Sequence, residues 1–139
     1  YGGINMTQTS LEKRIEELEN VRALRELVDT FSILADKKEV WKQTELFTKD
    51  ATVDSYVNGV LTSSLKGTEE IGEAFEGFLA NFETVYHSNG QHVVSINGNK
   101  AEGILYCRVD LISSENGKKV NNASAVTYRD EYVLKTDSG

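Results

Sequence analysis

The sequence contains no proline, one cysteine and one tryptophan among its 139 residues. Without proline or a low-complexity tract no linker is visible, and the length suits a single domain with its own core. The one cysteine, Cys107, cannot form an internal disulfide, so nothing calls for an oxidising compartment. We expect it to be a small buried apolar residue, not a nucleophile, because no cationic neighbour is suggested.

Positive charge and long apolar runs are also scarce. The 22 acidic and 15 basic residues give a net charge of −7, which argues against nucleic acid or an anionic membrane as partner, since both require a basic surface. No apolar run is long enough to span a bilayer, and no signal segment is recognisable. We therefore expect a cytoplasmic protein. We interpret residues 1–8 as a leader and place the single domain at residues 9–139.

Helical periodicity dominates the first part of the chain. Thr9 and Glu12 predict a capping box, after which apolar residues recur every three or four positions as far as Leu34. Residues 36–38 interrupt this rhythm, and we expect a short helix over residues 40–47. A further amphipathic helix is expected after Gly67. Its apolar face, which we place in the core together with Trp41, consists of Ile71, Phe75, Phe78, Leu79 and Phe82.

Elsewhere the apolar period changes to two, which is typical of strands. Two strands are expected at residues 51–57 and 60–65, joined by an Asn58-Gly59 turn. Three longer ones are expected at about residues 85–96, 100–112 and 119–134. In the middle one an apolar inner face alternates with a more polar outer face; its inner residues are Gly103, Leu105, Cys107, Val109 and Leu111. The pattern predicts one α+β domain, with helices first and an antiparallel sheet after them.

Motifs that carry chemistry are few. There is no Walker loop, dinucleotide fingerprint, paired-cysteine site or nucleophile elbow, so we expect no cofactor. His87 and His92 have no acidic residue between them, which does not favour a zinc site. Asp36 near a helix end and His87 near a strand start remain, because a carboxylate beside an imidazole makes a general base. Fifty-one residues separate the two, and each can equally be an ordinary polar residue.

Four segments, taken together and in order, resemble the SnoaL-like branch of the nuclear transport factor 2-like superfamily. They are LVDTFSILADKKEVWKQTELFTKDATVDSY, LKGTEEIGEAF, YHSNGQHVVSINGNKAEG and VTYRDEYVLKTDSG. The first matches the helix, short helix and LF-x-x-DA phrase of that branch, and the third its H-x-x-x-N strand. The branch is similar to scytalone dehydratase, lindane dehydrochlorinase and bile-acid dehydratase. The resemblance implies a cone-shaped α+β barrel of the cystatin-like type, in which helices and a curved antiparallel sheet enclose an apolar cavity.

The resemblance also implies that Asp36 and His87 meet inside this cavity as a catalytic dyad. Gln91 stands near the place of a family asparagine, and Tyr56 and Tyr128 match cavity tyrosines of relatives of the scytalone dehydratase type. We expect these three to bind substrate, with packing as the alternative for the tyrosines.

A regular strand from Val85 would put His87, Gln91 and Val93 on one face and His92 on the other. Ser55 lies near the place of the catalytic aspartate of ketosteroid isomerases, which does not favour that chemistry.

These expectations indicate a cofactor-independent lyase or isomerase of the dehydratase type that acts on a small apolar substrate. The alternative is a non-catalytic module that binds a hydrophobic ligand or a partner chain. Dimerisation through the outer sheet face, common in the family, would suit either. The family continues with a tryptophan-bearing final strand after its DG turn, whereas this sequence stops at Gly139. We therefore expect a truncated chain, or one whose final strand is missing from this sequence, with one cavity wall incomplete and no counterpart to the arginine that lindane dehydrochlorinase carries there.

Overall fold

The computed structural model describes residues 2–3 and 10–135, and the predicted leader lies mostly outside them. The element order is α1 (Leu11–Asp36), α2 (Val40–Thr44), β1 (Thr52–Val57), β2 (Val60–Lys66), α3 (Thr68–Leu79), β3 (Thr84–Asn97), β4 (Lys100–Glu115) and β5 (Lys118–Val133). Strands β3, β4 and β5 form one antiparallel sheet, and β1 and β2 form a separate hairpin. The predicted α+β class is confirmed.

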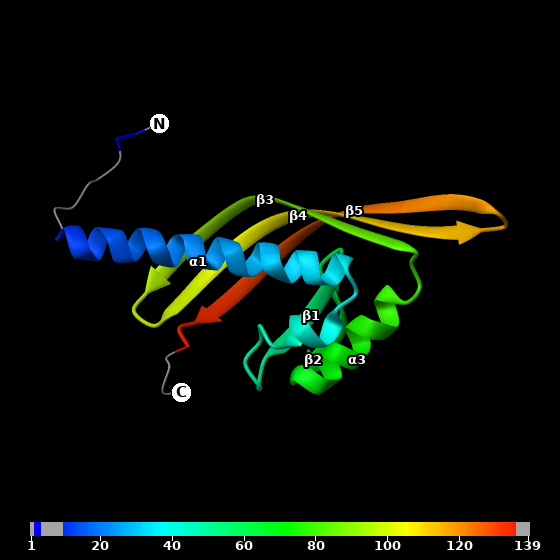
Figure 1. Ribbon diagram of the computed structural model, residues 1–139, viewed down its shortest axis with the longest axis horizontal. Coiled ribbons are helices and arrows are strands. Elements are labelled where there is room, and N and C mark those ends of the chain that lie inside the picture. The colour runs from blue at the N-terminus through cyan, green and yellow to red at the C-terminus, as the bar shows by residue number, and fades with distance from the viewer. Residues whose placement is uncertain (1, 4–9, 136–139) are drawn as a thin grey trace.

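Helix α1 lies across the three-stranded sheet, whereas α3 and the β1–β2 hairpin gather below the carboxyl end of α1 (Figure 1). The long strands bend along their length, and the tip of the β4–β5 hairpin projects beyond the other elements. The described strands make an open, cone-like arrangement and do not close into a complete barrel.

The two ends of α1 are fixed by different local signals. Ser10 caps the helix, because its hydroxyl accepts a hydrogen bond from the backbone nitrogen of Lys13 at 3.2 Å; the predicted cap, Thr9, lies outside the described residues. At the other end Lys38 adopts a left-handed conformation, with φ of 59°, and its ammonium group donates to the carbonyl of Phe82. The helix therefore stops directly after Asp36, which is held in the last turn.

Two of the hairpin turns form at Asn-Gly pairs of the sequence. Asn58-Gly59 and Asn116-Gly117 both have two consecutive positive φ angles, 52° and 79° in the first and 52° and 78° in the second. This conformation matches the twist of the flanking strands. Because the second turn takes only two residues, β4 extends to Glu115 and not only to residue 112.

The core lies where the carboxyl end of α1 meets α2, α3 and the start of β3. Ala35, Val40, Leu79 and Val85 form a buried cluster there. The expected inner face of β4 is confirmed as far as Val109, because Leu105, Cys107 and Val109 are buried while the residues between them are exposed.

Trp41 does not belong to this core. Its ring lies against Gly72, where an added methyl group would come within 2.5 Å of it, and its indole nitrogen donates to Glu76 at 3.0 Å. The side chain is 47% exposed, so the core prediction for Trp41 is wrong. It covers the surface between α2 and α3 because a glycine in α3 leaves room for it there.

Candidate functional site

Asp36 and His87 are in direct contact. Oδ1 of Asp36 lies 2.7 Å from Nδ1 of the His87 ring and also accepts the backbone N–H of His87 at 3.0 Å. The two side chains are 21% and 10% exposed. One carboxylate oxygen thus fixes both the main chain and the ring of the same histidine. The last turn of α1 and the start of β3 supply the two residues.

The contact fixes the tautomer of His87. A carboxylate only accepts hydrogen bonds, so the proton of the neutral ring is on Nδ1 and the lone pair is on Nε2. The ring lies on the inner face of the sheet, because His87 pairs with the buried Val109 of β4. The arrangement is a histidine base that is oriented by a carboxylate on an apolar surface.

Further polar residues of α1 bind the middle of β3. The amide of Asn89 donates to the carbonyl of Val28 at 3.2 Å and to Asp29 at 3.0 Å, and its oxygen accepts from Ser32. Arg25 donates to the carbonyls of Asn89 and Gly90 at 3.3 and 2.8 Å. We call this set the α1–β3 polar seam; it consists of Arg25, Asp29, Ser32 and Asp36 on α1 with His87, Asn89 and Gly90 on β3.

The seam residues other than Asp36 and His87 were missed in the sequence. Their signal is the spacing on α1, since residues 25, 29, 32 and 36 recur every three or four positions and so share one helix face. A polar stripe of this kind, beside the apolar stripe of the same helix, indicates a helix whose side chains form hydrogen bonds with a neighbouring strand.

Strand β3 contains a β-bulge directly at the seam. Asn89 pairs with Cys107 and His92 with Leu105, so three steps on β3 match two on β4. The extra residue reverses the alternation of side chains. The prediction that His87, Gln91 and Val93 share a face is therefore wrong: Val93 is 70% exposed, and His92 lies on the inner face with His87.

The other predicted site residues are farther from the dyad. Gln91 is exposed within the bulge, and Tyr56 is 62% exposed on the β1–β2 hairpin. Tyr128 lies on the inner face, opposite Leu105 in the ladder. Burial is the main cause that raises the pKa of its phenol well above the usual range, so it is a neutral hydrogen-bond donor.

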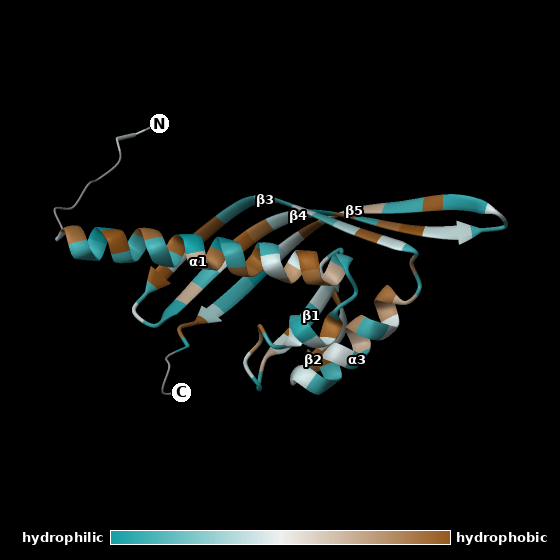
Figure 2. Ribbon diagram, viewed as in Figure 1, coloured by the Kyte–Doolittle hydropathy of each residue, from teal (hydrophilic) through white to brown (hydrophobic). Residues whose placement is uncertain are grey.

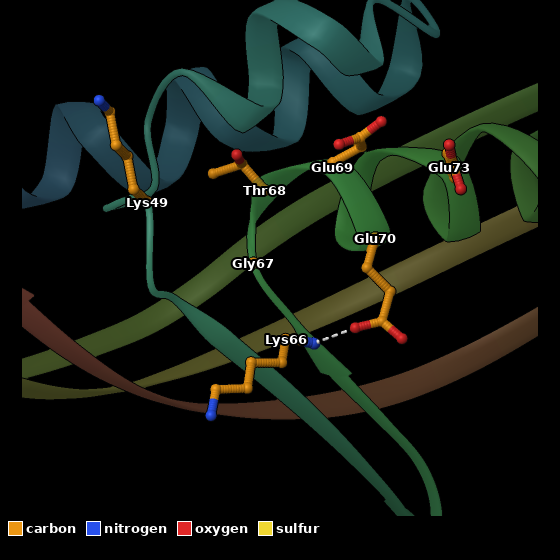
Figure 3. Close-up of a pocket in the computed structure, with 7 residues that line it drawn as sticks. All are labelled: Lys49, Lys66, Gly67, Thr68, Glu69, Glu70 and Glu73. Carbon is orange, nitrogen blue, oxygen red and sulfur yellow. Dashed lines mark hydrogen bonds between the residues drawn. The ribbon is translucent and has the colours of Figure 1, made fainter.

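Two open surface hollows lie away from the dyad. The larger, of about 500 Å³, is formed around the start of α3 by two lysines, three glutamates, Gly67 and Thr68. In Figure 3 the side chains of Lys49 and Lys66 point apart, and Glu70 accepts the backbone N–H of Lys66 at 2.7 Å. The second, of about 360 Å³, lies along α1 beside Arg25 and Asp29. Neither includes Asp36 or His87.

In residues 2–3 and 10–135, no three histidine, cysteine, aspartate or glutamate side chains are placed to share a metal ion. The helices in the same part of the chain are each too short or too polar to traverse a bilayer.

Comparison with known sequences decides the family. The sequence profile of the SnoaL-like domain matches residues 16–138, most of the chain. The chain belongs to the SnoaL-like domain family. The resemblance inferred from the sequence segments is thereby confirmed. No curated protein sequence matches this SnoaL-like domain.

Solved structures share the fold of this SnoaL-like domain. A proposed scytalone dehydratase from Novosphingobium aromaticivorans is 19% identical with a TM-score of 0.72, over 87% of this chain and 77% of that one. An NTF2-like protein with a cystatin-like fold from the same organism is 22% identical, TM-score 0.69, over 93% and 80%. A proposed dehydratase of the NTF2-like family from Streptomyces avermitilis is 15% identical, TM-score 0.62, over 80% and 84%. At these identities the comparison establishes the cystatin-like fold.

Proposed function

We propose that this SnoaL-like domain is a cofactor-independent lyase or isomerase of the dehydratase type. Its substrate is a small, largely apolar molecule that lies on the inner face of the sheet. The observation that carries the proposal is the 2.7 Å contact between Asp36 and the His87 ring. A carboxylate that fixes a histidine tautomer on an apolar surface is an arrangement suited to proton transfer near neutral pH.

The proposed reaction begins with removal of a proton from a carbon next to a carbonyl group. Nε2 of His87 takes this proton, and the negative charge of Asp36 stabilises the imidazolium that results. The electron pair of the C–H bond first forms an enolate, from which the step can reverse by return of a proton to carbon. The enolate then forms a carbon–carbon double bond as the C–O bond on the neighbouring carbon breaks. The imidazolium returns its proton to the departing hydroxide as water, so the residues end in their starting state.

A neutral tyrosine on the inner face can donate a hydrogen bond to an oxygen atom of the substrate. Tyr128 is on the inner face opposite Leu105, and burial keeps its phenol protonated by raising its pKa. We propose that it donates a hydrogen bond to an oxygen atom of the bound substrate. Tyr56 and Gln91 are exposed on other surfaces, and we assign them no step.

The test is loss of water from a panel of β-hydroxy ketones, followed by the ultraviolet absorbance of the enones formed. We expect turnover that falls by roughly 100-fold or more in His87→Gln and Asp36→Asn, the usual size of a general-base contribution. Tyr106→Phe is the matched control, because Tyr106 is 53% exposed on the outer face of β4. Equal turnover in all four proteins would exclude the dyad as the catalyst.

One observation favours a non-catalytic alternative. Neither surface hollow of the described residues includes the dyad, and the apolar inner face can hold a hydrophobic ligand without chemistry. On this alternative a ligand binds and is released unchanged, and His87→Gln alters only its affinity. Recovery of every panel compound intact after long incubation, together with measurable binding, would favour the alternative.

A further inference from the structure

A second hydrogen-bonded group occupies the inner face, beyond the Asp36–His87 dyad. The hydroxyl of Tyr132 lies 3.2 Å from Nε2 of His92 and donates to Oδ2 of Asp130, also at 3.2 Å. All three side chains are half-buried. The proposed reaction uses none of them, so the group calls for a separate explanation.

Tyr132 reaches His92 only because a glycine lies between them. Tyr132 pairs with Ala101 and His92 with Leu105 across β4, and Gly103 is the inner-face residue between those two positions. A Cβ atom on Gly103 would lie 2.9 Å from Cε2 of Tyr132 and 3.2 Å from its hydroxyl oxygen. The phenol thus crosses the strand over a position that has no side chain.

The hydrogen bonds of Tyr132 fix the tautomer of the neutral His92 ring. The Tyr132 hydroxyl gives its one proton to Asp130, so its oxygen is the acceptor for His92, and the ring proton of the neutral histidine is on Nε2. Nδ1 then has the free lone pair. Burial, with Arg25 as the second cause, lowers the pKa of His92, which favours the neutral ring. A neutral His92 therefore presents an acceptor, whereas the exposed lysines and arginines of the surface present only donors.

We propose that His92, oriented by Tyr132 and Asp130, is a second binding group that accepts a hydrogen bond from a hydroxyl group of the substrate. The proposal rests on the proposed function in taking the inner face as the binding surface. His87 and His92 are five residues apart on β3, including the bulge, which places them on the order of 13 Å apart along the strand. On β4, Cys107 pairs with Asn89 within this interval and Leu105 pairs with His92, and both β4 residues are apolar and buried.

This spacing defines a class of substrate. The molecule has a hydroxyl group at one end, an apolar and flat middle, and the reacting C–H and carbonyl at the other end, roughly 10 Å away. Multi-ring phenols and hydroxylated polycyclic ketones fit this description. Single-ring substrates are too short to reach both histidines.

The experiment compares multi-ring phenols with their methyl ethers, for example 4-hydroxybiphenyl with 4-methoxybiphenyl. Methylation removes the donated proton and keeps the apolar rings. We expect each phenol to bind roughly 3- to 10-fold more tightly than its ether, the range for one net hydrogen bond. Binding is followed by NMR of protein labelled with 15N in its histidine rings, in which the Nδ1 resonance of His92 should move with the phenol only.

Tyr132→Phe is the decisive variant, since it keeps the ring over Gly103 and removes the hydroxyl. It should abolish the preference for phenols, and the ring proton of His92 should no longer be confined to Nε2. Tyr106→Phe, on the outer face, should keep both the phenol preference and the Nε2–H tautomer. Phenols that bind no more tightly than ethers, or a preference that survives Tyr132→Phe, would overturn the proposal.

His87→Ala separates this proposal from the proposed function. If this variant retains the phenol preference while no panel compound is dehydrated by the parent protein, the His92 site stands and the enzyme proposal fails. If the parent protein dehydrates the panel and shows no phenol preference, the reverse holds.

Discussion

At the scale of single residues, Asp36 has two separable roles. Its Oδ1 atom accepts both the backbone N–H and the ring Nδ1–H of His87, so it connects the end of α1 to the start of β3. The same atom carries the charge that the proposed reaction needs. Structure requires only an acceptor at this position, whereas catalysis requires a negative one.

Two substitutions of Asp36 should therefore differ in their effect on the free energy of unfolding. Asp36→Asn keeps an amide oxygen as acceptor, so we expect its unfolding free energy to stay within about 1 kcal/mol of the parent. Asp36→Ala leaves the partly buried donors of His87 unpaired and should cost about 1–3 kcal/mol. Urea unfolding measures both. Equal stability of the two variants would contradict the bridging role.

The pH dependence of stability should carry a contribution from His92. Its pKa is lowered from 6.5 by burial and by Arg25, against weaker opposite effects of Asp130 and Asp29; Tyr132 is the remaining titratable contact. The folded state thus disfavours the charged ring, and the stability present above pH 6.5 falls as the unfolded state takes up the proton. His92→Gln should lose less stability than the parent between about pH 7.5 and about pH 5.5. Parallel urea-unfolding series would reject this origin if the two proteins lost stability equally.

The contact between Asp36 and His87 could be predicted only from the family resemblance. Asp36 ends a helix and His87 starts a strand, and no local pattern joins residues so far apart. The contact depends on how α1 crosses the sheet, which is tertiary. The buried state of Cys107, in contrast, followed from simple alternation along β4.

At the scale of elements, the α1–β3 polar seam and the bulge explain each other. A bulge leaves carbonyl groups without regular ladder partners, and Arg25 donates to the carbonyls of Asn89 and Gly90 there. Asp29 holds the guanidinium at 3.0 Å. The bulge in turn brings His92 to the inner face. Helix α1 therefore sets which side chains of β3 face the interior.

Arg25→Met should loosen the bulge and leave the dyad in place. The methionine keeps most of the apolar stem and removes the donors to both carbonyls. We expect faster amide hydrogen exchange over residues 89–92 and unchanged exchange at His87, whose partner is Asp36. Lys42→Met is a matched control, because Lys42 is exposed on α2. Unchanged exchange in the bulge would show that Arg25 does not maintain it.

Gly103→Ala should displace Tyr132. The new methyl group would lie 2.9 Å from Cε2 of Tyr132 and 3.2 Å from Cγ1 of Val94, closer than packed atoms approach. We expect a loss of roughly 1–3 kcal/mol and the disappearance of the NMR cross-peaks between the His92 and Tyr132 rings. Gly77→Ala, on the exposed side of α3 with open space around it, is the control and should be neutral or stabilising. Retention of the ring contact in Gly103→Ala would contradict the crossing geometry.

The positions of the helices and strands could be predicted from the sequence, whereas the bulge in β3 could not. Turn residues and apolar periods fixed the helices and hairpins to within a few residues. Gly90 was the only local hint of a bulge, since glycine inside a strand often marks one. The regular alternation assumed from Val85 onwards gave the wrong face for Gln91 and His92.

At the scale of the whole molecule, the outer face of the sheet is unusually apolar for a surface. Tyr86, Val93, Ile104 and Tyr106 are between 39% and 70% exposed there. Figure 2 shows further apolar residues along the first half of α1, of which Leu11 and Leu18 are 69% and 71% exposed. Exposed apolar patches often mark interfaces.

We propose that two copies pair through the outer face of the sheet. Tyr106→Glu puts a charge at the centre of this face and should convert the dimer to monomer, because a buried unpaired carboxylate opposes association. Sedimentation equilibrium measures the mass. Tyr56→Glu, on the hairpin, should leave it unchanged. A parent protein that sediments at the monomer mass of 15.5 kDa would contradict the pairing.

The central claim is that the Asp36–His87 dyad removes a proton from carbon, and hydrogen exchange in the substrate tests it most directly. The β-hydroxy ketones are incubated with protein in D2O, and deuterium next to the carbonyl is measured by mass spectrometry. We predict incorporation with the parent protein and with Tyr106→Phe, and loss of it in His87→Gln. Exchange that is equal in His87→Gln and the parent, or absence of both exchange and enone formation with the parent while the compounds bind, would contradict the claim.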